Sequence, residues 1–142
     1  MRDINNGVPN NPMAEARRYV ANARDALREH GKLNAETGRY EDPKYVKAAG
    51  HYLWSGVLIA LEAVFHVEAE KKKRKGKDNR VSVDDYTAAV SQRDQKLLGW
   101  ITDGYQIMHL SMGYDGIQAK RVCKEGFLIA NNIIDRCENL VS

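Results

Sequence analysis

Apolar side chains recur at helical spacing along most of this chain. The longest such run extends from Tyr45 to Val67, and its apolar or small residues return every three or four positions. They are Val46, Ala49, Leu53, Gly56, Val57, Ala60, Ala63, Val64 and Val67. Further large apolar residues widen this stripe, so the pattern predicts a helix that is mostly buried. Pro43 suits the first turn, and Asp42 or Glu41 just before it suits the cap.

A second apolar pattern predicts a helix from Pro12 to about His30. Asn11 is a suitable cap for its start, and Gly31 is a natural stop. The inner face consists of Ala16, Tyr19, Val20, Ala23, Ala26 and Leu27. The polar segment from Lys32 to Asp42 is expected to be a mobile connection to the next helix.

The segment from Ser82 to Met112 predicts two helices with a break between them. Ser82 and Asp85 have the spacing of a capping box, and the apolar spacing lapses from Ser91 to Arg93. The pattern then resumes as a seam whose members lie three or four positions apart. The seam consists of Leu98, Ile101, Tyr105, Met108 and Met112, and Leu97 and Trp100 widen it.

The last pattern predicts a helix from about Ile117 to Leu140, after a turn at Gly113–Gly116. Its buried stripe consists of Ala119, Val122, Gly126, Ile129, Ala130, Ile133, Ile134 and Cys137. No convincing strand pattern separates these helices. We therefore expect an all-α fold, an antiparallel four-helix bundle with one short extra helix before the third long one.

Length and composition fit one globular domain. The chain has 142 residues, of which 43% are hydrophobic and 29% are charged. We expect residues 1–11 to form a flexible tail and residues 12–142 to form the domain. Lys47, Glu62 and two histidines interrupt the longest apolar run, so it is not expected to span a membrane. Without an apparent signal peptide, the protein is expected to be cytoplasmic.

The two cysteines are expected to be buried free thiols. Cys123 and Cys137 are fourteen residues apart on one predicted helix, which separates them by about 21 Å along its axis. A disulfide requires Cα atoms within about 7 Å of each other. The sequence also lacks the Glu-x-x-His pattern of di-iron bundles and any Gly-rich phosphate loop. We therefore expect neither a metal site nor a cofactor.

The GYDG turn region holds the first candidate functional group. Tyr105, His109, Tyr114 and Asp115 lie close together along the chain and could form a polar cluster. Such a cluster could act on a substrate through the histidine. The alternative is that His109 is a core or interface histidine whose hydrogen bonds are satisfied by neighbouring tyrosines.

A second candidate group is a pocket between helices, with His51, Trp54 and Trp100 as walls. The alternative for these aromatic residues is packing in the core and at helix ends. Ser55 follows His51 by four residues, but no acidic residue on that face would orient the histidine. We therefore assign no catalytic residue.

The marked electrostatic feature is a run of five cations. It consists of Lys71, Lys72, Lys73, Arg74 and Lys75. These side chains could bind the phosphate backbone of a nucleic acid. The alternative is a solvated helix end, because cations are favourable near a helix C-terminus. The net charge of only +3 does not by itself indicate a nucleic-acid partner.

From about Met13 to Cys137, the chain resembles a family of small bacterial proteins of unknown function. The resemblance is carried by AEARRYVANARDAL, KYVKAAGHYLWSGVLIALEAV, QRDQKLLGWITDGYQIMHLSMGYDG and IIDRC. That family implies a helical bundle. More widely, the order of the helices is similar to the HEPN superfamily, whose members cleave RNA or accompany nucleotidyltransferases, often as dimers.

The resemblance to HEPN proteins does not extend to a catalytic motif. Ribonuclease members of that superfamily carry an arginine followed, after four to six residues, by a histidine. Thr102, Asp103 and Gly104 occupy those positions before His109. The resemblance therefore implies a bundle and an oligomer but transfers no catalytic residue to this chain.

Together these observations predict a non-catalytic binding or scaffolding bundle, HEPN-like, that self-associates as a dimer. An enzyme is not favoured, and a membrane is not expected as a partner. A nucleotidyltransferase is the candidate protein partner that the resemblance implies. The alternative is an RNA-binding or RNA-processing protein of the HEPN type that uses the Lys71–Lys75 run.

Overall fold

Helices make up most of the computed structural model, which describes residues 11–73 and 80–141. In chain order, its elements are α1 (Pro12–His30), β1 (Leu33–Asn34), β2 (Arg39–Tyr40), α2 (Pro43–Phe65), α3 (Val67–Lys73), α4 (Val83–Ser91), α5 (Gln95–Gly104), η1 (Tyr105–Tyr114) and α6 (Lys120–Val141). The π-helix η1 continues α5 directly. The mostly helical fold that the sequence predicts is therefore confirmed. The predicted tail lies outside the described residues except for Asn11.

Side-chain caps determine where the helices begin. Asn11 and Asp42 each accept a hydrogen bond, at 3.1 Å, from an amide in the first turn of α1 and of α2 respectively. At the start of α4, the Asp85 carboxylate accepts a hydrogen bond from the Ser82 amide at 2.8 Å. Amides in the first turn of a helix have no partner within the helix, so these polar residues stabilise the helix starts. The three predicted starts are confirmed.

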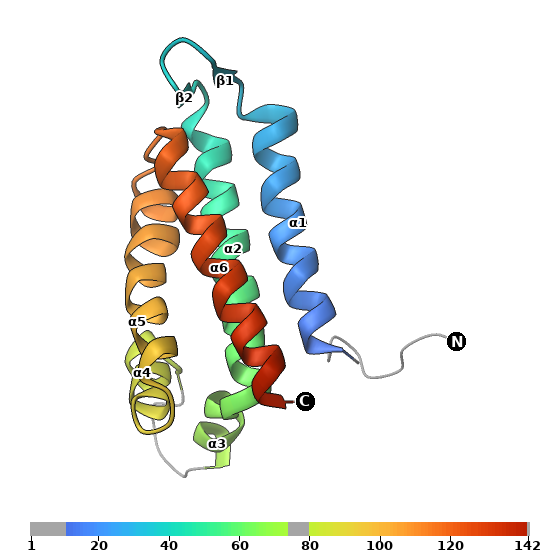
Figure 1. Ribbon diagram of the computed structural model, residues 1–142, viewed down its shortest axis with the longest axis vertical. Helices are drawn as coiled ribbons and strands as arrows, with labels where there is room; N and C mark the ends of the chain where they lie inside the picture. Colours follow the sequence, from blue (N-terminus) through green and yellow to red (C-terminus); the bar gives the residue numbers. More distant parts are fainter. Residues whose placement is uncertain (1–10, 74–79, 142) are drawn as a thin grey trace, which may run out of the picture.

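The longest apolar helix, α2, is the centre of the bundle. It packs against α1, α6 and η1, and Figure 1 shows it behind α6, with α1 on one side and α5 on the other. Along the chain, α1 rises in that view, α2 descends, α5 rises and α6 descends. Each long helix therefore runs opposite to the one before it.

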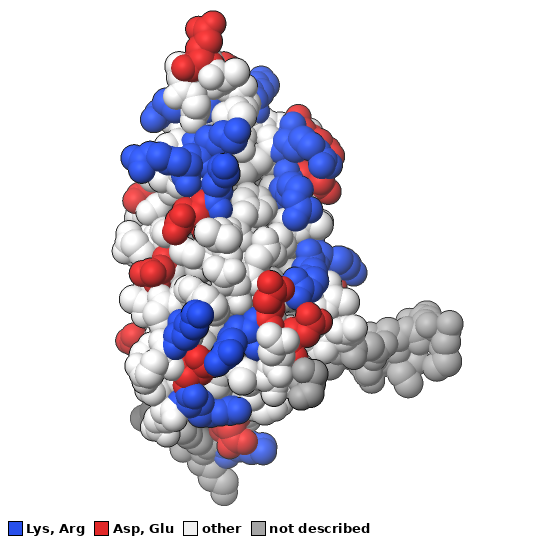
Figure 2. All heavy atoms as spheres, in the orientation of Figure 1, with Lys and Arg blue, Asp and Glu red and all other residues white. Residues whose placement is uncertain are grey.

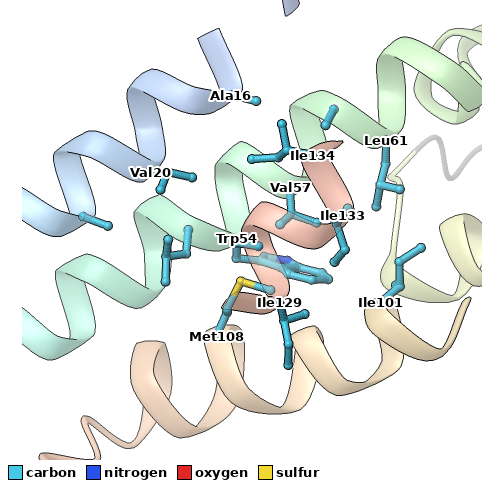
Figure 3. Packing of buried hydrophobic residues seen from close by; sticks show 14 of the residues in the cluster. Ala16, Val20, Trp54, Val57, Leu61, Ile101, Met108, Ile129, Ile133 and Ile134 are labelled. Atoms are coloured by element: carbon cyan, nitrogen blue, oxygen red, sulfur yellow. The ribbon is translucent and has the colours of Figure 1, made fainter. Parts of the chain in front are cut away.

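The core lies between α2, α6 and the continuous α5–η1 helix. Figure 3 shows Trp54 and Val57 of α2 close to Ile129 and Ile133 of α6, with Met108 of η1 beside them. All five side chains are at most 8% exposed. By length and composition, α2 could cross a membrane, and half of its most apolar window is buried inside the protein. Its central place in the core accounts for this apolar composition.

The connection between α1 and α2 differs from the prediction. Within Lys32–Asp42, β1 and β2 form an antiparallel hairpin in which Leu33 pairs with Tyr40. The hairpin also contacts the segment before α6, where the Gln118 side chain donates a hydrogen bond to the Tyr40 carbonyl at 2.8 Å. Strands of two residues are too short to show an alternating pattern, so the sequence did not reveal them.

Three helix boundaries also differ from the prediction. α2 ends at Phe65 because His66 is left-handed, at φ 53°, so the charged segment after it is a separate helix, α3. Between α2 and α5, the described residues therefore form two short helices, α3 and α4, where one was predicted. The predicted GYDG turn is helical up to Tyr114. The chain turns at Gly116, whose φ is 65°, and α6 begins at Lys120.

The buried faces are shifted slightly from the predicted ones. Leu97 is fully buried where Leu98 was expected, and Cys123 is buried where Val122 was expected. Tyr105 is only half-buried. Besides Gly113, the buried positions along α5 and η1 are Leu97, Ile101, Gly104, Met108 and Met112. The last three are four residues apart, and the wider turn of a π-helix keeps such positions on one face.

Candidate functional site

Four side chains with aromatic rings meet where α2 packs against η1. The Trp54 ring centroid lies 5.6 Å from that of Tyr105 and 6.1 Å from that of His109. Tyr105 and His109 stack with their centroids 5.1 Å apart. The His51 ring lies 6.4 Å from the His109 ring. We call these four residues the aromatic–histidine cluster.

The aromatic–histidine cluster depends on close approach of the α2 and η1 backbones. A Cβ atom on Gly50 would lie 2.5 Å from the Gly113 nitrogen and 2.5 Å from the Met108 carbonyl oxygen. No side chain larger than hydrogen fits such a gap without displacing one helix. The glycine contact therefore brings the rings on α2 within reach of those on η1.

His109 is the unusual member of this cluster. Its Nδ1 atom is buried and has no hydrogen-bond partner within the part of the chain that the structure describes. Burial lowers the pKa of His109, and the nearby His51 lowers it further. The imidazole is therefore neutral at physiological pH, where its nitrogens can accept or donate hydrogen bonds but carry no charge.

The aromatic–histidine cluster takes two members from each of the two candidate groups that the sequence suggests. The remaining candidates lie elsewhere. Trp100 packs under Lys96, whose Nζ lies 5.4 Å from the ring centroid. Tyr114 is 76% exposed, and Asp115 is also exposed. The structure therefore separates these three residues from the cluster.

The described part of the lysine run is ion-paired within the protein. Lys71, Lys72 and Lys73 form ion pairs with acidic residues of α3 and α4 at 2.9, 3.1 and 3.4 Å respectively. Arg74 and Lys75 lie outside the described residues. The three lysines that can be placed therefore have their charges partly balanced by neighbouring carboxylates.

Both cysteines are buried, as predicted, and neither forms a disulfide. Burial raises the pKa of the Cys123 thiol to about 11. Burial, with the Asp94 charge nearby, raises the pKa of the Cys137 thiol to about 12. Both are therefore protonated near neutral pH and are poor nucleophiles. Among residues 11–73 and 80–141, no group of three or more His, Cys, Asp or Glu residues could hold a metal ion.

Glu62 joins three helices, a role that the sequence did not suggest. Its carboxylate accepts hydrogen bonds from the Tyr86 hydroxyl at 2.9 Å and from the Glu68 and Ala69 amides at 2.8 and 3.1 Å. These amides belong to the first turn of α3, so Glu62 caps that helix while holding α4. Its partner Tyr86 is 24 residues away, and no local pattern indicates such a contact.

Replacing Glu62 by alanine is expected to lower the free energy of unfolding by about 1–2 kcal/mol. The Tyr86 hydroxyl, on a side chain only 5% exposed, would lose its acceptor, and α3 would lose its cap. Urea unfolding followed by circular dichroism measures the change. Glu62→Gln keeps one acceptor oxygen and should lose less stability than Glu62→Ala. Equal losses in both variants would argue against the capping role.

A cavity of about 460 Å³ opens beside this junction. Leu58, Ile59 and Ala63 of α2 form one wall, and Val81 and Tyr86 form another. Its polar lining includes the Glu62 carboxylate, which already has the three donors described above, together with His66 and Glu68. Glu68 pairs with Lys72 at 3.1 Å, so two of the three polar groups already have partners within the protein.

Comparisons with known proteins agree with this helical fold. A family model described as a domain of unknown function (DUF5618) matches residues 11–139. A solved structure, a protein of unknown function from Dyadobacter fermentans, is 40% identical to this chain. The match covers 92% of this chain and 96% of that chain, with a TM-score of 0.77. No curated protein matches the chain.

These comparisons confirm the predicted resemblance to a bacterial family of unknown function, while the wider resemblance to HEPN proteins stays a prediction. The family model extends from the cap of α1 nearly to the end of α6. The match thus includes every helix that surrounds the aromatic–histidine cluster. The chain therefore belongs to the family described as a domain of unknown function, DUF5618.

Proposed function

We propose that this protein is a non-catalytic, HEPN-like binding module that pairs with a second copy through the outer face of α2. We define this face as the half-buried or exposed residues on the side of α2 away from α6, namely Ala48, His51, Tyr52, Ser55, Leu58 and Ile59. One observation carries the proposal: between Lys47 and Glu62 this partly exposed helix has no charged residue.

The composition of the outer face is typical of an interface core. Such cores are depleted of charged residues and enriched in aromatic ones. Tyr52 is 37% exposed, and Tyr19 of α1 lies beside it with ring centroids 6.2 Å apart. His51 belongs both to this face and to the aromatic–histidine cluster, which extends from the face toward η1. Covering an exposed apolar surface of this kind lowers the free energy of the system, which favours association.

The outer face is also compatible with pairing to itself. In a two-fold arrangement centred on Ser55, Tyr52 would meet Leu58 of the second copy, and His51 would meet Ile59. These pairs arise because the residues lie three or four positions on either side of the centre. The small Ser55 side chain at the centre lets two helices approach closely.

These observations favour self-association over RNA binding through the Lys71–Lys75 run. The three lysines of the run that the structure describes already have carboxylate partners. Binding a phosphate would have to compete with those ion pairs. The outer face of α2, in contrast, stays partly exposed among the described residues, so a second copy would not have to displace another part of the protein.

The proposal is tested by the mass of the protein in solution. The chain has a mass of 16.1 kDa, and light scattering after size-exclusion chromatography is expected to give twice that value. Tyr52→Asp is expected to be monomeric, because the dimer would bury an unpaired carboxylate. Its circular dichroism should match that of the wild type.

A matched control is available on the opposite side of the bundle. Leu128 on α6 is 56% exposed and lies outside the proposed interface. Leu128→Asp is therefore expected to remain dimeric. A monomeric wild type at every concentration studied, or a dimer that survives Tyr52→Asp, would contradict the proposal.

A further inference from the structure

A second cavity, of about 310 Å³, opens between α1, the β1–β2 hairpin and α6. Its lining consists of Arg24, Leu27, Arg28, Leu33, Tyr40 and Phe127. We propose that this cavity binds a small organic anion with an apolar body, such as a carboxylic acid that carries one ring or a short alkyl chain. The site lies away from the outer face of α2, so the proposal does not depend on self-association.

The cavity has an apolar interior. Leu27 at its base is 4% exposed, whereas Leu33 at its edge is 41% exposed although it is a large apolar residue. Phe127 is half-buried on the α6 side. Burial raises the pKa of the Tyr40 phenol, so Tyr40 is a neutral wall of the site. Since ligand pockets are about 300–1,000 Å³, this volume suits a small ligand.

The charged groups of the lining are both guanidinium ions. Arg24 and Arg28 are one helical turn apart, where like charges destabilise a helix unless they are balanced. Arg28 forms ion pairs with Asp25 at 2.6 Å and with Glu29 at 3.8 Å, both through one terminal nitrogen, and the other N–H groups of its guanidinium remain available. Arg24 has no ion pair or side-chain hydrogen bond within the described part of the chain. An anion in the cavity would supply the missing partner.

Further cations lie on the α6 side of the cavity. Lys120 and Lys124 precede Phe127 by seven and three positions, which places them along the same face of α6. Both are exposed and, among the described residues, neither side chain forms an ion pair. Figure 2 shows Lys and Arg side chains on both sides of an uncharged strip near the hairpin end of the molecule, with Asp and Glu side chains beside the cations on the right.

Of the residues that the structure describes, none that lines the cavity is acidic, so no carboxylate among them faces the two arginines from within it. Asp25 and Glu29 line a separate groove between α1 and α2. Both carboxylates reach Arg28, but neither Asp25 nor Glu29 lines the cavity. The lining therefore combines apolar walls with two arginines at the rim, of which Arg24 has no ion pair within the described residues and Arg28 is partly balanced. This arrangement fits a ligand whose apolar part enters the cavity while its carboxylate contacts the arginines.

The proposal is tested with 4-phenylbutyrate, compared with the neutral 4-phenylbutanol and the cationic 4-phenylbutylamine. In ¹H–¹⁵N NMR titrations of the full chain, phenylbutyrate is expected to give saturable shifts in residues 24–40 and 120–127. Phenylbutanol is expected to bind about tenfold more weakly, since it cannot form the charge-assisted hydrogen bonds that a carboxylate forms with the arginines. Phenylbutylamine is expected to bind more weakly still, because the arginines repel it.

The double variant Arg24→Gln, Arg28→Gln is expected to weaken phenylbutyrate binding about tenfold while leaving phenylbutanol binding unchanged. Arg18→Gln is the matched control on the same helix. Its side chain is 76% exposed and pairs with Glu15, so binding should not change. Absence of saturable shifts, equal affinity for all three probes, or shifts confined to other parts of the protein would overturn the proposal. None of these outcomes bears on self-association, which is tested separately by the mass of the protein in solution.

Discussion

Replacing Gly50 by alanine is expected to lower the free energy of unfolding by about 3 kcal/mol, at the upper end of the usual penalty for overpacking. The added methyl group would lie 2.5 Å from backbone atoms of Met108 and Gly113. Backbone atoms cannot rotate aside as the end of a flexible side chain can. The α2 and η1 helices would have to separate, which would also disturb the His51–His109 contact. Urea unfolding followed by circular dichroism measures the loss.

Gly99 provides the matched control for this substitution. It lies within α5 and is exposed, and a Cβ atom added there meets nothing within 4 Å. Gly99→Ala is therefore expected to raise stability by about 0.5–1 kcal/mol, the ordinary difference between the two residues inside a helix. If Gly50→Ala behaved like Gly99→Ala, the two backbones would not be in contact.

Replacing Asp94 by alanine is expected to lower the free energy of unfolding by about 2–3 kcal/mol. Asp94 is 8% exposed and caps α5, where it accepts a hydrogen bond from the Leu97 amide at 3.0 Å. Its second oxygen accepts a hydrogen bond from the Arg136 Nε at 2.7 Å. The Arg136 side chain is 42% exposed, so water would screen part of the loss. Urea unfolding again measures the change.

The same ion pair predicts how stability depends on pH. Burial alone would raise the pKa of Asp94, but the Leu97 amide and the Arg136 guanidinium outweigh burial, and the pKa lies below its ordinary value. The stabilisation is therefore complete above about pH 4, the ordinary pKa of an aspartate. It is lost as the pH falls through the lower pKa of the folded state. In the Asp94→Ala variant, this part of the acid-induced loss should be missing.

Two further variants separate the cap from the charge. Asp94→Asn keeps an acceptor for the Leu97 amide but loses the negative charge, so its stability should lie between those of Asp94→Ala and the wild type. Asp103 on the same helix is exposed, and Asp103→Ala is expected to change stability by less than about 0.5 kcal/mol. Equal effects of Asp94→Ala and Asp103→Ala would show that the ion pair does not stabilise the fold.

The helix starts were predictable because they depend on residues close together in the sequence. A cap such as Asn11 acts on an amide three residues later, so its pattern is complete within one short window. Helical faces are similarly local, since they repeat every three or four positions. Even so, the prediction placed Leu98 on the seam and Leu97 beside it, whereas Leu97 is fully buried and Leu98 is half-buried. Neighbouring positions have similar local patterns, and only the packing of whole helices distinguishes them.

The candidate site was only partly accessible from the sequence. His51 and Trp54 on α2, and Tyr105 and His109 on η1, each stood out as aromatic or titratable residues near a helix face. Their assembly into one cluster requires α2 and η1 to meet at Gly50. A glycine inside a helix does not reveal which other backbone it contacts. The two candidate groups therefore could not be joined before the helices were placed in space.

The order of apolar, polar and capping residues along this chain was sufficient for its helical character, its main helix starts and two buried thiols. These properties arise from interactions within a few residues or from the burial of one helix face. The hairpin, the left-handed break at His66, the Glu62 junction and the arginine-lined cavity depend on residues brought together from distant positions. Which distant groups meet is determined by how whole helices pack, because packing decides which backbones can approach and which charges remain without a partner.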